Sequence, residues 1–354
     1  MIRIELKKKF KKDEMNFFFK LTSNRIVIFG PSGCGKTTLL KMICGICTPD
    51  SGFVSVKNRC LYSSADSIDL PVYERNIGYL PQESALFPNM KVKDNILYGS
   101  RRSETTADKK RFCRLVDKLQ IESKLEEYPA SLSGGQKQRA ALARTLMINP
   151  CILLLDEPFT GLDSPIKNCL RDIVIDIADD ESIPLLFVSH NIEDCYCVGK
   201  ELVVMDNGEV IEFGQSTEIL ENPKLSRTAR LFDYRNIWPI EKIEDNGGLV
   251  HLKNGIMISS CRKISDSFKY LCVRPEKIRV LNVDKEKSPG IINSFYGTIL
   301  EDHGRGAYRS LLFLSDSGYR FEVNVSETYL KKTNLAKSDR ALIYLDEESM
   351  IFCR

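Results

Sequence analysis

The stretch RIVIFGPSGCGKTT, residues 25–38, places a glycine-rich loop directly between a short apolar run and a Thr/Leu-rich segment. The apolar run is continuous rather than alternating, which is typical of a strand buried on both faces of a parallel sheet. Gly30 and Gly35, followed by Lys36 and Thr37, match the phosphate-binding loop that connects such a strand to a helix. The stretch therefore predicts an α/β fold with an anion site at the start of a helix.

Each part of this loop has a chemical task in holding a nucleotide. Glycines let backbone N–H groups point at the phosphates, and the helix amino terminus adds partial positive charge. Lys36 reaches the outer phosphates, and the Thr37 hydroxyl is a ligand for Mg²⁺. The predicted nucleotide-binding set is the whole loop: Gly30, Pro31, Ser32, Gly33, Cys34, Gly35, Lys36, Thr37 and Thr38.

Two carboxylates follow a second apolar run. In CILLLDEP, residues 151–158, Asp156 and Glu157 stand at the carboxyl end of the predicted strand, where open α/β sheets place their ligands. We expect Asp156 to hold the hydration shell of Mg²⁺, and Glu157 to orient and deprotonate the attacking water. The alternative is that Glu157 only pairs with a lysine.

A second glycine-rich turn lies far downstream of the first. LSGGQKQR, residues 132–139, predicts a helix that starts after the two glycines, with Ser133 in the capping position and Asn149-Pro150 at its end. Its amino terminus is another anion site. If the first loop cradles the α- and β-phosphates, the second can meet the γ-phosphate from the opposite side. A two-fold, head-to-tail dimer builds two such sites at once.

These motifs occur in an order that resembles the ATPase subunits of ATP-binding-cassette (ABC) transporters: GPSGCGKTT, LSGGQKQR, CILLLDEP, TGLD and the histidine of LLFVSH. The resemblance covers residues 1 to about 225. It implies that Gln82 senses Mg²⁺ and the attacking water, that Asp163 contacts the partner subunit, and that His190 is the switch at the γ-phosphate. It also implies which residues serve the nucleotide of the other subunit: Ser133, Gly134, Gly135 and Gln136.

Two aromatic positions receive roles from the same resemblance. Members of the family stack adenine on an aromatic ring upstream of the phosphate loop, and the candidate here is Phe10 in KKKFKK. The phenylalanines at 17–19 are alternatives that fit a core equally well. Phe87, in YLPQESALFP, is expected to line the groove on which a permease docks a short helix. Burial in the core of the helical insert is the alternative for Phe87.

Length and pattern predict two domains, because 354 residues exceed what one core usually holds. Residues 1–225 are expected to form an α/β P-loop NTPase of the ABC type, with a helical subdomain at about 88–130. A linker at 226–235 leads to an all-β regulatory domain at 236–354, where short strand-like pieces resemble a barrel of the OB or TOBE type. Its halves, 236–285 and 286–354, are candidates for two small barrels.

Composition argues against several partners. Lys and Arg number 51 against 48 Asp and Glu, and a net charge of +3 gives no long-range attraction to nucleic acid or to an anionic membrane. The longest apolar runs fall far short of the ~20 residues that a membrane span needs. Twelve scattered cysteines, with no apolar leader, predict reduced thiols in a cytoplasmic protein. We therefore expect no nucleic-acid partner.

The resemblance also implies a reaction and partners. The chain is expected to hydrolyse ATP with Mg²⁺ as a homodimer at the cytoplasmic face of the cell membrane, for a permease served by an extracytoplasmic binding protein. LFPNMKVKDNILYG and the strand-rich tail look most like importers of molybdate or tungstate, with Ser326 as the candidate oxyanion residue in the tail. Importers of sulfate or thiosulfate, ferric iron, polyamine or sugar are alternatives. A soluble ABC ATPase of DNA repair or translation is the alternative from another class.

Overall fold

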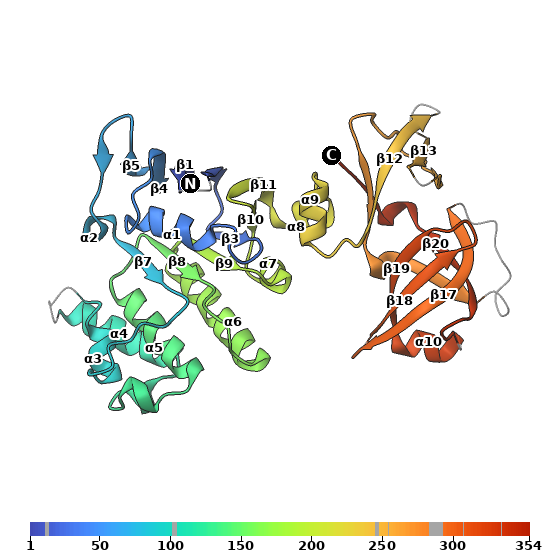
Figure 1. The fold of residues 1–354 in the computed structure, drawn as a ribbon. Helices are drawn as coiled ribbons and strands as arrows, with labels where there is room; N and C mark the ends of the chain where they lie inside the picture. Colours follow the sequence, from blue (N-terminus) through green and yellow to red (C-terminus); the bar gives the residue numbers. More distant parts are fainter. Residues whose placement is uncertain are drawn as a thin grey trace. The chain divides into compact units, whose positions relative to one another are not determined.

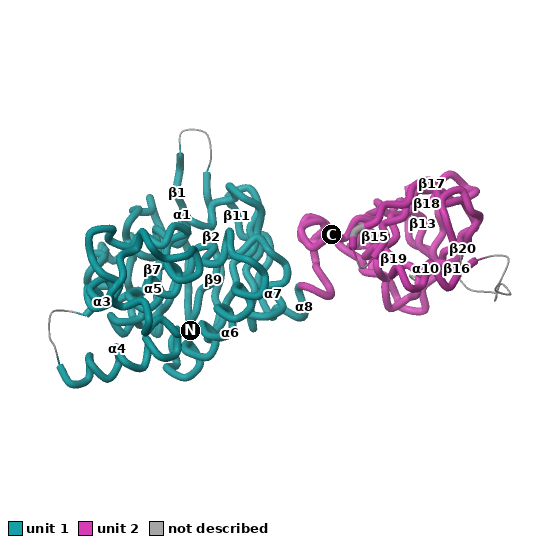
Figure 2. Tube along the Cα trace, turned by 90° about the horizontal axis from the view of Figure 1, so that it is seen from below, with its two compact units in different colours: residues 1–219 teal, residues 220–354 magenta. Residues whose placement is uncertain are grey.

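The computed structural model describes residues 1–10, 14–100, 105–244, 248–253, 255–282, 293–306, 308–333 and 335–354. They form two compact units, Met1–Ile219 and Leu220–Arg354 (Figures 1 and 2). The predicted combination of an α/β domain with an all-β region behind it is confirmed. None of the helices in the described ranges is both long enough and apolar enough to cross a membrane.

Unit 1 is built on one sheet, with the strand order β6-β5-β4-β1-β2-β11-β10-β3-β9-β8-β7 in the described residues. The parallel part of the sheet holds the continuous apolar runs, because both of its faces are covered. Its strands are β3 (Arg25–Phe29), β7 (Ile77–Leu80), β8 (Ile152–Asp156), β9 (Leu185–Ser189) and β10 (Glu201–Asp206). The remaining strands are β1 (Ile2–Lys9), β2 (Glu14–Leu21), β4 (Ser51–Val56), β5 (Arg59–Ser63), β6 (Ile68–Asp69) and β11 (Glu209–Gln215).

The helices of unit 1 follow the strands in alternation, as the sequence pattern predicts for an α/β fold. The phosphate loop leads into α1, which buries one face against the strands of the sheet in a shared hydrophobic core. The helices are α1 (Lys36–Cys44), α2 (Val72–Arg75), α3 (Val92–Leu97), α4 (Thr106–Lys118), α5 (Gly134–Met147), α6 (Ser164–Asp180), α7 (Ile192–Cys197) and α8 (Ser216–Glu221), the last of which crosses into unit 2.

The helical subdomain is larger than the range 88–130 that the sequence predicts. In the structure α3 and α4 pack on α5, so the helical region continues to Met147 (Figure 1). Three buried alanines of α5, at 140, 141 and 143, allow this close approach. At Gly99 the backbone comes so near that an added Cβ would lie 2.3 Å from the carbonyl oxygen of Arg144.

Unit 2 contains two five-stranded antiparallel sheets, ordered β14-β13-β12-β15-β21 and β16-β20-β17-β18-β19 among the described residues. Both sheets contribute to a single hydrophobic core, to which β12 gives Trp238 and β20 gives Ile343. The strands are β12 (Asn236–Glu244), β13 (Leu249–Leu252), β14 (Met257–Ser259), β15 (Tyr270–Val273), β16 (Ile278–Asn282), β17 (Ser294–Arg305), β18 (Tyr308–Ser315), β19 (Arg320–Ser326), β20 (Arg340–Leu345) and β21 (Met350–Cys353).

Two boundaries in this region differ from those predicted. The range 226–235 is not a free linker, because α9 (Ser226–Leu231) occupies it and Ala229, Phe232 and Tyr234 are buried. The two sheets also do not divide at residue 285. β16 precedes that point but joins the second sheet, whereas β21, at the end of the chain, joins the first. Each predicted half therefore contributes one strand to the sheet of the other half, and both sheets line one hydrophobic core.

Candidate functional site

The phosphate loop lies between β3 and α1 and has the geometry of an anion cradle. Gly33 and Gly35 have φ of 82° and 103°, a region that side chains with a Cβ rarely adopt. Lys36 is only 4% exposed, and its Nζ donates to the carbonyl oxygens of Gly30 at 2.8 Å and Pro31 at 2.9 Å. The ammonium is thus held at the loop before any ligand arrives.

The second feature of the site is the buried carboxylate of Asp156 at the end of β8. The Thr37 hydroxyl donates to its Oδ1 at 3.1 Å, and the Tyr79 hydroxyl donates to its Oδ2 at 3.2 Å. Burial raises the pKa of Asp156, and the two hydrogen bonds oppose this shift only in part. The pKa of Tyr79 is raised as well, by its own burial and by the charge of Asp156.

Tyr79 is a site residue that sequence reasoning did not identify. It lies on β7, which pairs in parallel with β8, and its partner in the register is Leu154, two residues before Asp156. No local sequence pattern marks Tyr79, since its hydroxyl reaches Asp156 only because β7 and β8 are neighbours in the sheet. Gln82, predicted as a ligand near Mg²⁺, lies exposed in the loop after β7 and makes no hydrogen bond to Asp156 in the described part of the chain.

The third feature is a row of three polar side chains, those of Lys36, Glu157 and His190. The Oε1 of Glu157 lies 3.7 Å from the Nζ of Lys36, and its Oε2 lies 3.0 Å from the Nδ1 of His190. Thr160 donates to the same carboxylate at 3.3 Å. Glu157 has a φ of 46°, a strained value for a residue with a long side chain. The lysine pair expected as an alternative role for Glu157 therefore exists, but in the phosphate loop itself.

A cavity of about 260 Å³ opens beside Glu157 and His190, and Thr160, Ser164 and Lys167 also line it. The loop between β8 and α6 forms one wall. Asp163, predicted to contact a partner subunit, is exposed in this loop just before α6 and makes no capping hydrogen bond with its side chain. The carboxylate is thus available at the surface next to the site.

The glycine-rich turn at 132–139 begins α5 as predicted. The Ser133 hydroxyl accepts the N–H of Gln136 at 3.4 Å, and the Gln136 side chain accepts the N–H of Ser133 at 3.0 Å. This reciprocal capping pairs the backbone amides of Ser133 and Gln136. Within the described residues of one chain, no hydrogen bond or ion pair joins Ser133 or Gln136 to the phosphate loop.

The aromatic residues predicted to stack on adenine lie at different depths in unit 1. Phe10 is 44% exposed at the end of β1. Of the alternatives at 17–19, Phe17 and Phe19 belong to the core, while Phe18 is exposed and packs edge-on against Phe213 at 6.1 Å. The structure instead places Met15 against the loop, since a Cβ added to Gly35 would lie 3.1 Å from the Met15 Sδ.

Phe87 is exposed rather than buried in the helical region, which rules out the alternative of a core residue. Its ring lies 4.7 Å from that of Tyr98, also exposed, and the guanidinium of Arg144 lies 5.1 Å from the ring centre. The Asn95 side chain holds the Phe87 backbone at both its N–H and its carbonyl. The result is a rigid aromatic surface on the helical region.

Ser326 lies where β19 ends, and the structure gives its hydroxyl a structural task. The Ser326 Oγ accepts the N–H of Tyr329 at 3.2 Å and so caps α10 (Glu327–Thr333). A capping serine has this lone pair occupied, and Glu327 follows it directly. The predicted oxyanion role for Ser326 therefore finds no support in this geometry.

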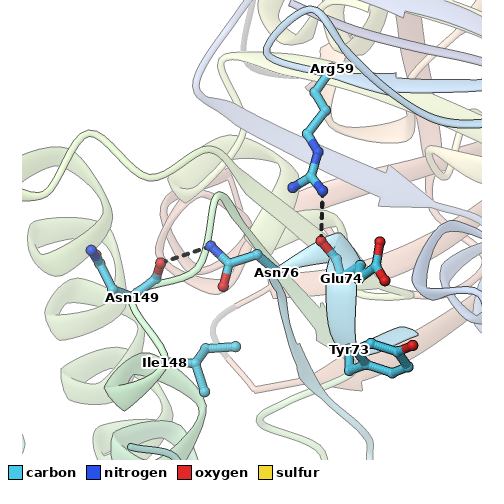
Figure 3. Close-up of a pocket in the computed structure, with 6 residues that line it drawn as sticks. All are labelled: Arg59, Tyr73, Glu74, Asn76, Ile148 and Asn149. Atoms are coloured by element: carbon cyan, nitrogen blue, oxygen red, sulfur yellow. Dashed lines mark hydrogen bonds between the residues drawn. The ribbon is translucent and has the colours of Figure 1, made fainter. Parts of the chain in front are cut away.

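A larger cavity of about 660 Å³ lies near the amino-terminal ends of β7 and β8 (Figure 3). Asn76 and Asn149, which line it, precede β7 and β8, whereas Asp156 ends β8. Arg59 at its rim donates to the backbone carbonyl of Glu74 at 2.8 Å. Since open α/β sheets bind ligands at the carboxyl ends of their strands, this cavity is not the nucleotide site.

The fold and this arrangement define a P-loop nucleotide-binding protein. Residues 15–160 match the family model described as ABC transporter. The chain is 36% identical over 219 residues to a molybdenum import ATP-binding protein, ModC, of Vibrio parahaemolyticus, and 40% identical over 215 residues to a sulfate/thiosulfate import ATP-binding protein, CysA, of Acinetobacter baylyi. These alignments cover 62% and 59% of this chain, and the chain spans 58% of each relative's length.

A longer alignment joins the chain to the ModC protein of Rhizobium johnstonii, with 32% identity over 295 residues, covering 78% of this chain and 82% of the relative. The solved dimeric structure of the ATP-binding cassette MJ0796 bound to ADP and Pi shares the fold, with a TM-score of 0.52 and 24% identity, over 61% of this chain and 99% of that one. The chain belongs to the ABC transporter family, as one of its ATP-binding subunits.

The raised pKa of Asp156 predicts that this residue destabilises the nucleotide-free protein at neutral pH. A carboxyl with a raised folded-state pKa favours the fold below its ordinary value of 3.8, and this contribution is lost as pH rises through the folded value. Asp156→Asn is therefore expected to raise the Tm at pH 7. The rise should be about 2–4 °C for each kcal/mol gained in the free energy of unfolding, for a unit of this size.

Thermal unfolding followed by circular dichroism measures this difference between pH 4 and pH 8. The gain should shrink as the pH falls through the raised folded-state pKa toward 3.8, because the wild-type carboxyl then becomes protonated in the folded chain. Asp172→Asn, an exposed change on α6, is the matched control and should leave the Tm unaltered at every pH. A Tm for Asp156→Asn equal to or below that of the wild type at pH 7 contradicts the prediction.

Proposed function

We propose that the chain is the ATP-hydrolysing subunit of an importer and that it powers a partner permease in the cell membrane. The observation that carries the proposal is the position of Glu157, whose carboxylate lies between the phosphate-loop ammonium of Lys36 and the imidazole of His190. A carboxylate in this position can take a proton from water at the terminal phosphate. Membership of the ABC transporter family supports the same reading.

In the proposed reaction the loop amides and Lys36 bind the phosphates, and the Lys36 ammonium moves from its two carbonyl partners to the phosphate oxygens. Glu157 orients the attacking water and accepts its proton as the water oxygen bonds to the γ-phosphorus and the bond to the β-phosphate oxygen breaks. His190 holds the second carboxylate oxygen and so fixes the direction of the first. Phosphate and ADP are the products.

The oxygen atoms of Thr37 and Asp156 fit Mg²⁺, which prefers hard oxygen ligands. Gln82 lies in the adjoining loop and is proposed as a further oxygen donor. When bound, Mg²⁺ supplies charge neutralisation at the phosphate oxygens. The hydrogen bond from Tyr79 keeps the Asp156 carboxylate oriented toward Thr37, so that both oxygen donors face the same side.

We further propose that two copies form a head-to-tail dimer, in which Ser133, Gly134, Gly135 and Gln136 of one copy meet the nucleotide of the other. The capped turn that starts α5 presents free amides, and in one chain it does not bond to the phosphate loop. Asp163 is exposed beside the site for contact with the second copy. Phe10 remains the proposed adenine platform, with Met15 as the neighbour nearest the loop.

The aromatic surface of Phe87, Tyr98 and Arg144 is the proposed dock for the permease, which places the chain at the cytoplasmic face of the membrane. An extracytoplasmic binding protein would deliver the cargo. For the cargo we propose molybdate, since the alignment to the Rhizobium ModC protein covers 78% of this chain and so extends beyond the 219 residues of unit 1. Sulfate is the second candidate, because the CysA relative is 40% identical over the cassette.

The base role of Glu157 predicts that Glu157→Gln lowers the ATPase kcat at least ~100-fold while ATP binding is kept, because the amide orients water but cannot accept its proton. Steady-state phosphate release and binding of a fluorescent ATP analogue measure the two effects. Glu74→Gln, at the far edge of the sheet, is the matched control and should keep the wild-type rate. Turnover at the wild-type rate in Glu157→Gln would remove the residue from this role.

The proposed dimer predicts that two inactive variants complement each other. Lys36→Ala spoils the phosphate loop, and Ser133→Arg blocks the capped turn, so each variant alone should lose nearly all ATPase activity. In a mixed dimer one site receives both lesions and the other receives none. An equal mixture should therefore recover about a quarter of the wild-type activity if subunits exchange at random. If the mixture stays as inactive as its components, each site is built within one chain.

The cargo is tested with membrane vesicles that contain this chain and the membrane protein that copurifies with it. Such vesicles are expected to accumulate labelled molybdate when ATP is supplied, and the Glu157→Gln chain should abolish the uptake. Accumulation of labelled sulfate in place of molybdate would assign the chain to sulfate import. Copurification with ribosomes or DNA, and with no membrane protein, would refute the transport proposal itself.

A further inference from the structure

A buried charged cluster lies directly beneath His190, and nothing in the proposed reaction uses it. Asp194 on α7 is 4% exposed and accepts three donors. Its Oδ2 accepts the hydroxyl of Ser189 at 2.6 Å, and its Oδ1 lies 3.1 Å from both the Arg171 guanidinium and the Lys167 ammonium. Burial of a carboxylate is costly unless it is paired, and here two cations of α6 compensate its charge.

Ser189 transmits this arrangement to the turn that carries His190. It is the last residue of β9, and its Oγ accepts the N–H of Asn191 at 3.0 Å while the same hydroxyl donates to Asp194. The residue before His190 therefore binds the residue after it, through a hydrogen bond from the Asn191 N–H to the Ser189 hydroxyl. Because a serine hydroxyl has one proton, its donation to Asp194 fixes the lone pair that faces Asn191.

His190 itself is half exposed, so its own packing does little to hold the ring. Its Nδ1 is nevertheless 3.0 Å from Glu157, a distance that requires a defined backbone at residue 190. The cavity beside the site is lined by Glu157, His190, Lys167 and Asp194 together. The cluster thus forms part of the wall of this cavity, and its carboxylate is paired with Ser189, Arg171 and Lys167.

We propose that Asp194, acting through Ser189, is a positioning residue that sets the backbone of His190 and with it the orientation of Glu157. The expected effect on the reaction rate rests on the proposed ATPase function. The positioning of the His190 backbone by Asp194 and Ser189 does not depend on that function. Arg171 and Lys167 make the position of Asp194 rigid, and since both belong to α6, they tie the His190 turn to the loop that carries Asp163.

The kinetic test compares Ser189→Ala and Asp194→Asn with two matched changes. Ser189→Ala and Asp194→Asn are expected to lower kcat about 10–100-fold, as for misplaced catalytic groups, with the Kd for ATP unchanged. Ser189→Thr keeps the hydroxyl and should restore most of the rate. Glu193→Gln is the control, because Glu193 also pairs with Arg171 at 3.1 Å but makes no bond to Ser189.

A double-variant comparison separates positioning from general stability. In a His190→Ala background, Asp194→Asn is expected to lower the remaining rate by less than about twofold, because the residue it acts through is gone. A merely structural role would lower the rate by the same factor in both backgrounds. Equal factors would overturn the proposal.

A spectroscopic readout decides the inference even if the wild-type chain fails to hydrolyse ATP, an outcome that would refute only the proposed function. The chain has three histidines, so the ring signals in a ¹H–¹³C spectrum are few, and His190→Ala assigns one of them. Ser189→Ala is expected to shift the His190 signal in the nucleotide-free protein, while those of His251 and His303 stay in place. An unmoved His190 signal in a folded Ser189→Ala chain would overturn the proposal.

Discussion

The buried ammonium of Lys36 is the interaction on which the site depends. A lysine that is 4% exposed has lost nearly all of its water, and the loop replaces that water with two carbonyl oxygens and a carboxylate 3.7 Å away. Such partners stabilise the charge only in part, because carbonyl dipoles are weaker partners than an anion. A phosphate that enters the loop is a better partner than those it displaces. The loop between β3 and α1 thus holds the Lys36 ammonium in place.

The second charge in the site has the opposite problem. In the proposed role Asp156 faces a divalent cation as an anion, yet burial raises its pKa and disfavours the charged form. Thr37 and Tyr79 each donate to it, and these bonds favour the charged form but offset the effect of burial only in part. A buried carboxylate that burial disfavours is an example of the common trade between stability and function.

Sequence reasoning recovered what is encoded locally. The phosphate loop, the Ser133 cap and the carboxylates after β8 are short-range features, in which residue type and spacing determine the backbone. It missed Tyr79 and Met15, because each becomes relevant only through a neighbour distant in sequence, Asp156 in one case and Gly35 in the other. The predicted range 88–130 for the helical region is shorter than the observed one for the same reason. The packing of α3 and α4 on α5 sets its extent, and no sequence pattern within 88–130 shows this packing.

Unit 2 shows the same limit on a larger scale. Several strands there are predicted as short strand-like pieces of sequence. The assignment of β16 and β21 to sheets, however, depends on pairing between residues far apart in the chain, such as Ile278 with Leu345 and Tyr270 with Cys353. Each sheet includes a strand from beyond residue 285 or before it, and both sheets line one hydrophobic core, so strand pairing and packing join the two halves of unit 2.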